Sequence, residues 1–265
     1  MAEEMSFWSH LDALRKVLVR IALLLVALAI GFFCVMPWLF EHVITAPCEG
    51  SFVSYRLLGF IKGDGDWIPN MASEGFSVHL INIELASQLL VHMSASLWAA
   101  FIVGFPFIIY QLWTFVSPGL YEHEKRGARK AFFFGNVMFY LGLAMGYFVV
   151  FPLALRFLAD YQLSDKIANT VSLTSYMDTF YMILIMMGLF FELPLLAWLL
   201  GKMGLLKRTF FKKYRRYAIA GLLILSAVLT PTSDVFTLAV VFFPVYALWE
   251  ASALLIPKES EQPQE

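Results

Sequence analysis

Charged residues are scarce in this chain. Of its 265 residues, 15% are Asp, Glu, Lys or Arg and 60% are hydrophobic, whereas a soluble domain usually carries about 25% charged residues. The mean hydropathy is +0.72, and the apolar residues are gathered into long runs that contain few charges. Runs of about 18 or more such residues are typical of membrane-spanning helices. The composition therefore excludes a soluble domain and predicts an all-α polytopic membrane protein.

Residue patterns for catalysis or metal binding are also lacking. The two cysteines, Cys34 and Cys48, and the five histidines show no metal-ligand spacing, and no HExxH motif occurs. A disulfide is not expected, because Cys34 lies inside an apolar run. No nucleophile is paired with a base and no paired membrane aspartates occur, so an enzyme is disfavoured and no cofactor is expected. The net charge of −1 gives no indication of nucleic-acid binding.

No cleavable signal peptide is expected, because the first apolar run has no small-residue cleavage site. We predict a single membrane domain over residues 1–265 with an amphipathic arm at 1–16 and a polar tail at 256–265. The six predicted spans are 17–40, 89–113, 131–151, 177–200, 217–230 and 235–255. The fifth, at about 14 residues or roughly 21 Å, is shorter than a hydrocarbon core of about 30 Å.

Two outer segments separate these spans. The longer one, 41–88, contains the apolar patches 52–60 and 76–83, which are too short to cross a membrane and are expected to form short helices that cap the outer face. The other, 153–176, follows Phe151-Pro152, a pair that is expected to close the third span.

Lysine and arginine are distributed unevenly about the spans. Fifteen of the 19 lie on the arm, in the loop after the second span, in the loop 202–216 and in the tail, and four lie in the outer segments. Because cytoplasmic loops carry an excess of Lys and Arg, both termini and the loop after the second span are predicted to face the cytoplasm. The basic loop 202–216 is most simply a topology determinant in contact with lipid headgroups.

Three acidic residues are candidates for function. Glu192 lies at mid-span, where an ionisable group predicts a function or access to water, or else a carboxylate that is neutral or paired with backbone freed by Pro194. Asp234 is most simply the N-cap of the sixth span. Glu124 lies in the charged last part of the stretch 110–126, whose first part is aromatic and turn-forming. The alternative to a function for Glu124 is an exposed carboxylate paired with a neighbouring cation.

Short motifs occur in a fixed order along these spans. They are His10-Leu-x-x-Leu-Arg15, Ala46-Pro47, Phe105-Pro106, Tyr110-Gln-x-Trp-x-Phe115-x-x-Pro118-x-Leu120-Tyr-x-His-Glu124-Lys-Arg126, Gly146-Tyr-Phe-x-Val-Phe151-Pro-Leu-Ala154, Phe191-Glu192-x-Pro194 and Leu229-Thr-Pro-Thr-x-Asp234. Together they resemble the TatC family, the receptor subunit of the twin-arginine protein translocase. The resemblance covers nearly the whole chain.

The resemblance implies a concave bundle with short fifth and sixth spans in the cytoplasmic (inner) membrane. It implies a receptor that binds signal peptides bearing two consecutive arginines on folded precursors, in transport driven by the proton-motive force. TatA- and TatB-type single-span proteins, membrane lipid and further copies of this chain are the implied partners. No nucleic acid is expected to bind.

The resemblance also implies site residues. Glu124 is expected to bind a signal arginine, and the other expected residues of the signal-peptide site are Phe115, Leu120, Arg126, Arg15 and Asp12. Pro47 belongs to a motif of the outer face, and Glu192 is expected to face a concave pocket within the membrane.

Two positions depart from the family pattern. Ala13 stands where the family usually has a Glu that helps to bind the arginines, so Asp12, Glu122, or one of two acids in the arm, Glu3 and Glu4, would have to replace it. Leu238 stands where a Gln is common. The runner-up function is a secondary transporter or channel for a small solute that uses Glu192, although no internal repeat relates the two halves of the chain.

Overall fold

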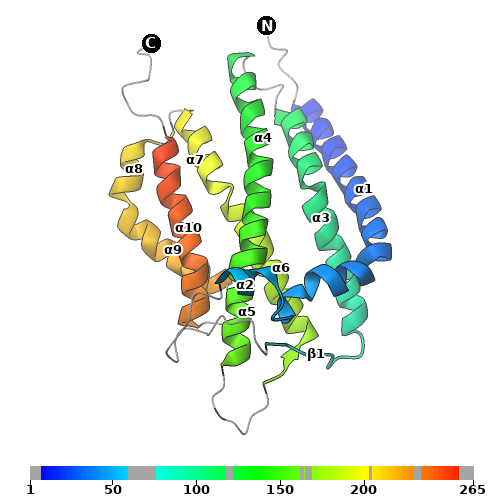
Figure 1. Cartoon of the computed structure of the whole chain (residues 1–265). Helices are drawn as coiled ribbons and strands as arrows, with labels where there is room; N and C mark the ends of the chain where they lie inside the picture. The colour runs from blue at the N-terminus through cyan, green and yellow to red at the C-terminus, as the bar shows by residue number, and fades with distance from the viewer. Residues whose placement is uncertain are drawn as a thin grey trace. The chain divides into compact units, whose positions relative to one another are not determined.

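Helices form almost all of the regular structure in the computed structural model (Figure 1). The structure describes residues 7–58, 76–116, 122–161, 164, 169–202, 205–229 and 234–256. Five described segments are long and apolar enough to cross a membrane: Leu11–Cys48, Ser87–Phe115, Phe132–Asp160, Leu173–Lys202 and Val235–Leu255. The prediction of an all-α polytopic membrane protein is confirmed.

The predicted fifth span is α9 (Arg215–Leu229). It has 15 residues, which is about 22 Å of helix, so it falls below the length of the five longer segments. The sixth, α10 (Val235–Leu255), has the predicted bounds, and its 21 residues make it the shortest of those five. The count of six spans is consistent with the five segments together with α9.

The chain divides into two compact units. Unit 1 comprises residues 1–40 and 88–136, and unit 2 comprises residues 41–87 and 137–265. The single membrane domain that we expected over the whole chain stays a prediction.

Unit 1 contains α1 (Phe7–Leu39), α3 (Ser87–Val116) and the first part of α4 (Glu122–Met145). The described part of the predicted arm, residues 7–16, is not a separate helix, since α1 runs from Phe7 through the first span without a break, and neither Gly nor Pro occurs before residue 31 to interrupt it. A polar contact joins α1 to α3: the ring of His92 stacks on that of Phe33 at 3.9 Å, and His92 Nε2 donates a hydrogen bond of 2.8 Å to the Phe33 carbonyl oxygen.

In unit 2, α4 continues through a π-helical turn, η4 (Gly146–Val150), into α5 (Phe151–Asp160). The expectation that Phe151-Pro152 closes the third span is wrong. Pro152 lies in the first turn of α5, where a missing N–H is tolerated, and the adjacent π turn absorbs the change in hydrogen bonding.

The helix α6 (Leu173–Phe190) packs closely on α4. A Cβ atom added at Gly142 would lie 2.4 Å from the Met187 carbonyl oxygen, so only glycine allows the two backbones to approach this far. The start of α6, four residues before the predicted span, is set by Ser172, whose side chain accepts a hydrogen bond of 3.2 Å from the Ser175 N–H.

The outer segments of unit 2 form a layer of short elements: η1 (Phe40–Ile44), η2 (Ala46–Cys48), α2 (Val53–Leu58), β1 (Leu80–Ile81) and β2 (Val171–Ser172). The predicted short helix at 52–60 is confirmed by α2. The patch 76–83 is not helical but extended, and β1 pairs in parallel with β2. Its burial alternates, since Phe76 and Val78 are covered while Ser77 and His79 are exposed, which is the period of a strand.

Tyrosine hydroxyls bond to carbonyl oxygens of η1 within this layer, at the end of the first span. Tyr147 donates to the Val43 carbonyl at 2.7 Å and Tyr176 to the Ile44 carbonyl at 2.5 Å, so carbonyls that the helix end leaves without partners are satisfied by side chains. Tyr55, which is 1% exposed, donates to the Pro47 carbonyl at 2.8 Å. Burial raises the pKa of Tyr55 above its usual range, so the phenol stays a donor.

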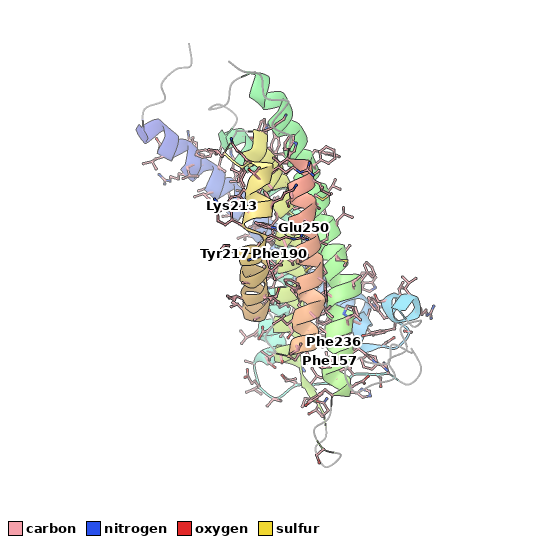
Figure 2. All side chains as sticks on the ribbon, turned by 90° about the vertical axis from the view of Figure 1, so that its left-hand side faces the viewer. Phe157, Phe190, Lys213, Tyr217, Phe236 and Glu250 are labelled. Atoms are coloured by element: carbon pink, nitrogen blue, oxygen red, sulfur yellow. The ribbon has the colours of Figure 1, made fainter. Side chains whose placement is uncertain are left out.

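The rest of unit 2 consists of α7 (Leu193–Lys202), α8 (Arg208–Lys213), α9 and α10. Ala197, Phe211 and Ile256 form a small core that joins α7, α8 and the end of α10. Near the beginning of α10, the Phe236 ring stacks on that of Phe157 from α5 at 4.6 Å, as Figure 2 shows.

Candidate functional site

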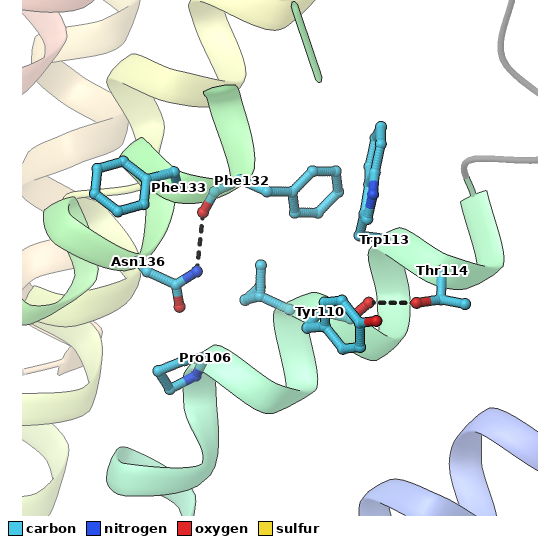
Figure 3. A pocket seen from close by; sticks show the side chains of 8 residues that line it. Pro106, Tyr110, Trp113, Thr114, Phe132, Phe133 and Asn136 are labelled. Atoms are coloured by element: carbon cyan, nitrogen blue, oxygen red, sulfur yellow. Dashed lines mark hydrogen bonds between the residues drawn. The ribbon is translucent and has the colours of Figure 1, made fainter. Parts of the chain in front are cut away.

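A cavity of about 560 Å³ lies between α3 and α4 in unit 1 (Figure 3). Aromatic and apolar side chains form most of its wall, with a few polar groups among them, a composition common in binding sites. The lining residues are Pro106, Ile109, Tyr110, Trp113, Thr114, Phe132, Phe133 and Asn136.

The two helices meet at this cavity through their rings. Trp113 of α3 and Phe132 of α4 have ring centroids 4.8 Å apart. Thr114 Oγ1 donates to the Tyr110 carbonyl oxygen at 2.9 Å, and Asn136 Nδ2 donates to the Phe132 carbonyl oxygen at 2.9 Å. These local bonds fix the polar side chains against their own helices and leave the rings to shape the cavity.

Two amide oxygens of α3 and α4 are buried without a hydrogen-bond partner, and one of the two residues, Asn136, lines the cavity. They are Asn136 Oδ1 and Gln111 Oε1. A buried acceptor without a donor is costly in a protein interior, and such groups are found at functional sites or where a ligand supplies the donor.

The predicted signal-peptide residues lie on the same two helices. Phe115, half-buried, is in the last turn of α3. Glu124 and Arg126 lie in the first two turns of α4, although their side chains are outside the described part of the structure, as is the whole of Leu120. Eight residues of helix, about 12 Å, separate Glu124 from Phe132 at the cavity.

The position of Glu124 suits a carboxylate. The first turn of a helix carries the positive end of the macrodipole, which favours the ionised form of an acidic side chain. Glu122 lies in the same turn and is helped in the same way. The turn therefore places two carboxylates at the end of α4 that leads to the cavity, with the cations Lys125 and Arg126 directly after them.

Asp12 and Arg15 lie on α1, and both are exposed. They are three residues apart, which places them on neighbouring positions of one helix face. Ala13, where the family pattern has a Glu, is half-buried. Asp12 is therefore the described acid of α1 that is open to a ligand near this position.

Glu192 lies where the fourth predicted span is broken, between α6 and α7. α6 ends at Phe190 and α7 begins at Leu193, so the break directly precedes Pro194. The freed backbone groups bond within the backbone, since Leu196 N donates to the Glu192 carbonyl at 2.9 Å and Phe191 N to the Met187 carbonyl at 3.1 Å. Glu192 Oε1 is buried without a hydrogen-bond partner, so pairing with freed backbone does not explain this carboxylate.

Asp234 and Pro47 have structural roles in the described residues. Asp234 Oδ1 accepts a hydrogen bond of 2.6 Å from the Thr237 N–H, so the interpretation of Asp234 as the N-cap of α10 is confirmed. Pro47 is buried in η2, and its carbonyl accepts the Tyr55 hydroxyl. Pro47 therefore anchors α2 in the outer layer.

Sequence reasoning missed Arg156, which it counted only as an outer cation. Arg156 is 7% exposed, its guanidinium lies 4.1 Å from the centre of the Phe76 ring, and its Nε is 2.8 Å from Asp160 Oδ2. These residues line a polar cavity of about 320 Å³ in the outer layer. The spacing of Arg156 and Asp160, four residues apart on a helix, was the signal available in the sequence.

The comparison with known families settles the resemblance. Residues 9–244 match the family model "Sec-independent protein translocase protein (TatC)". This chain belongs to the TatC family. Its place in that family, with the apolar segments described above, makes it a multi-pass protein of the inner membrane and a component of the Sec-independent, twin-arginine translocase.

Individual TatC proteins and structures agree with this assignment. The chain is 32% identical to the Sec-independent protein translocase protein TatC of Deinococcus radiodurans, over 97% of this chain and 90% of that protein. It is 35% identical to the TatC protein of Campylobacter jejuni over 71% of this chain and 76% of that one. A crystal structure of a twin-arginine translocase receptor, TatC, superposes with a TM-score of 0.71 at 28% identity and covers 93% of this chain and 97% of its own.

Proposed function

We propose that this TatC protein is the receptor for twin-arginine signal peptides and the core subunit of a translocase that exports folded proteins by means of the proton-motive force. The observation that carries the proposal is the aromatic cavity between α3 and α4, with Glu124 at the start of the same α4. Recognition of this kind is binding, in which no bond is made or broken, so we propose no enzymatic activity.

The chemistry of the arginine pair fits carboxylates. A guanidinium presents a planar fork of N–H donors that a carboxylate accepts in a bidentate manner, and such charge-assisted bonds are the stronger ones. Glu124 supplies one carboxylate. We propose that the second comes from Asp12, which is exposed on α1, with Glu122 and the arm acids Glu3 and Glu4 as the alternatives.

Arg15 and Arg126 carry the same sign as the signal arginines, so we assign them a positioning role. Arg15 follows Asp12 by three residues and Arg126 follows Glu122 by four, spacings at which helical side chains of opposite charge interact. Each cation orients a carboxylate until a signal arginine takes that carboxylate over.

The aromatic cavity provides the second half of recognition. Signal peptides also carry apolar residues, and burial of an apolar side chain among rings contributes roughly 25 cal/mol per Å² of surface removed from water. Trp113 and Phe132 offer this surface in the cavity, and the half-buried Phe115 lies in the same last turns of α3. Asn136 lines the cavity, and its buried acceptor Oδ1 takes a donor that a bound peptide backbone supplies.

The remaining proposals concern partners and the membrane. TatA- and TatB-type single-span proteins and further copies of this chain assemble with it, as its receptor role in the family implies. Glu192 acts as the polar group of a membrane-embedded pocket, and the short α9 thins the bilayer nearby. Cysteine labelling at position 192 in liposomes tests this role: a site sealed from water on both sides overturns it.

The central test is a binding measurement on the full-length chain in nanodiscs. A fluorescent twin-arginine signal peptide is titrated against the wild type and Glu124→Gln, and its twin-lysine form against the wild type. Loss of a charge-assisted bidentate pair costs about 2–3 kcal/mol, or roughly 30- to 150-fold in Kd. Glu84→Gln, an exposed acid of the outer segment, is the matched control and leaves the affinity unchanged.

Two results would overturn the receptor assignment: equal affinity for the twin-arginine and twin-lysine peptides, or full affinity in Glu124→Gln. The second carboxylate is identified by the same titration with Asp12→Asn and Glu122→Gln. The second carboxylate is the residue whose substitution lowers the affinity for the twin-arginine peptide but not for the twin-lysine peptide.

A further inference from the structure

The basic run between α7 and α9 lacks acidic neighbours in the sequence. Seven lysines and arginines lie between residues 202 and 216, whereas no Asp or Glu occurs between 193 and 233. Arg215 finds its acid on α10, where Glu250 Oε1 lies 2.8 Å from its Nε. Lys212, Lys213 and Arg216 are exposed. The excess of positive charge favours an anionic partner.

A ladder of aromatic rings lies beside these cations. The ring centroids of Phe210 and Tyr214 are 4.6 Å apart, and those of Tyr214 and Tyr217 are 6.2 Å apart. The three rings are 40%, 38% and 74% exposed. Lys213 Nζ lies 5.6 Å from the centre of the Tyr214 ring, and Figure 2 labels Lys213 on α8 and Tyr217 on α9. Exposed tyrosines next to lysines are typical of the level of the lipid headgroups.

The opposite face of α8 is fixed. Phe211 is 5% exposed, and its ring centroid lies 4.6 Å from that of Trp249 on α10. Because Phe211 anchors the helix in the core with Ala197 and Ile256, the cations and the ring ladder are held outward. The surface is a preformed platform rather than a flexible charged loop.

An exposed stripe continues from this platform along α9. Tyr217, Gly221, Ile224 and Val228 recur at helical spacing and are all exposed, and the space beside Gly221 is open. Cations, then tyrosines, then an apolar stripe match the order of phosphate, glycerol and acyl chain in a phospholipid. A polar acidic peptide would leave the apolar stripe uncovered, so the order of the surfaces favours a lipid.

We propose that α8 and the first turns of α9 bind the phosphate of an anionic phospholipid. Lys212, Lys213 and Arg216 surround the headgroup, Tyr214 and Tyr217 contact the glycerol region, and the acyl chain lies along the stripe of α9. Besides these contacts, the proposed lipid site requires only the predicted orientation of the chain in the membrane. It is separate from signal-peptide recognition, so failure of one leaves the other standing.

Native mass spectrometry of the full-length chain, released from detergent with defined phosphatidylglycerol or phosphatidylcholine, tests the proposal. The wild type retains phosphatidylglycerol at least about 30-fold more tightly than phosphatidylcholine, and Lys213→Gln/Arg216→Gln loses about 30-fold of the phosphatidylglycerol affinity, since each of the two cations contributes about 1 kcal/mol near an anionic headgroup. The matched pair Lys16→Gln/Arg20→Gln, exposed cations on α1, keeps the wild-type ratio.

The swap Lys213→Arg/Arg216→Lys preserves the charge and the binding, which separates loss of the site from loss of the fold. Four outcomes overturn the proposal: equal retention of the two lipids, an equal loss in the α1 pair, displacement of phosphatidylglycerol by inorganic phosphate at the same concentration, or tighter binding of an acidic peptide than of the lipid.

Discussion

The outer layer of unit 2 and the α3–α4 end of unit 1 use aromatic and polar side chains in opposite ways. In the outer layer, the tyrosine hydroxyls of Tyr55, Tyr147 and Tyr176 each reach a carbonyl oxygen, and the aromatic rings there pack into a buried cluster. At the α3–α4 end, the rings surround an open cavity, and Asn136 Oδ1 in its wall has no hydrogen-bond partner. The same kinds of residue thus form a buried scaffold with hydrogen-bonded tyrosine hydroxyls in one place and, in the other, an open cavity with an acceptor that lacks a donor.

The largest expected effect comes from overpacking the contact between α4 and α6 in unit 2. Gly142→Ala places a methyl group where the Met187 carbonyl oxygen would be 2.4 Å away, and neither helix backbone can yield. We expect a loss of about 3 kcal/mol in the free energy of unfolding, measured by denaturant titration in detergent micelles. Gly221→Ala, at a glycine with open space beside it, should be neutral or stabilising by up to about 1 kcal/mol. Equal effects at both positions would contradict the close packing of α4 and α6.

A paired experiment then separates scaffold from binding surface. Trp113→Ala removes a wall of the cavity and should weaken the twin-arginine peptide by about 1–2 kcal/mol, roughly 5- to 30-fold in Kd, with little change in the unfolding free energy. Tyr55→Phe leaves the Pro47 carbonyl without its donor and should lower the unfolding free energy by about 1–2 kcal/mol, with unchanged peptide affinity. The contrast between the regions fails if both variants lose both properties.

The smallest expected effect lies at a helix cap. Asp234→Ala removes the acceptor of the Thr237 N–H and should lower the unfolding free energy by about 1 kcal/mol without affecting peptide binding. Asp178→Ala, an exposed acid within α6, should change it by less than about 0.5 kcal/mol. A loss of peptide affinity in Asp234→Ala would assign this turn a role beyond capping.

Local signals predicted those elements that local interactions determine. The bounds of α10, the capping role of Asp234, the short α9 and the break near Pro194 all follow from residues within one or two turns of the feature. The family followed from motifs spread along the chain, and the match over residues 9–244 confirms it.

Other features depend on contacts between distant segments. Pro152 does not end the helix of the third span, because a π-helical turn precedes it. The patch 76–83 is extended, because β2 pairs with β1 in this patch. Burial of Arg156 required the ring of Phe76, about 80 residues earlier in the chain. The roles of Glu124 and Asp12 stay predictions, since they concern a ligand and not the fold.

The tyrosine bonds at the end of the first span set an order of events in biosynthesis. Tyr147 and Tyr176 lie 104 and 132 residues after the carbonyls that they satisfy. At 5–20 residues per second, the ribosome needs on the order of 10 s to make this length of chain. During that interval the newly inserted first span has an incomplete outer end, where water or an insertion factor must occupy the two carbonyls. The outer layer can therefore mature only when the fourth span has entered the membrane.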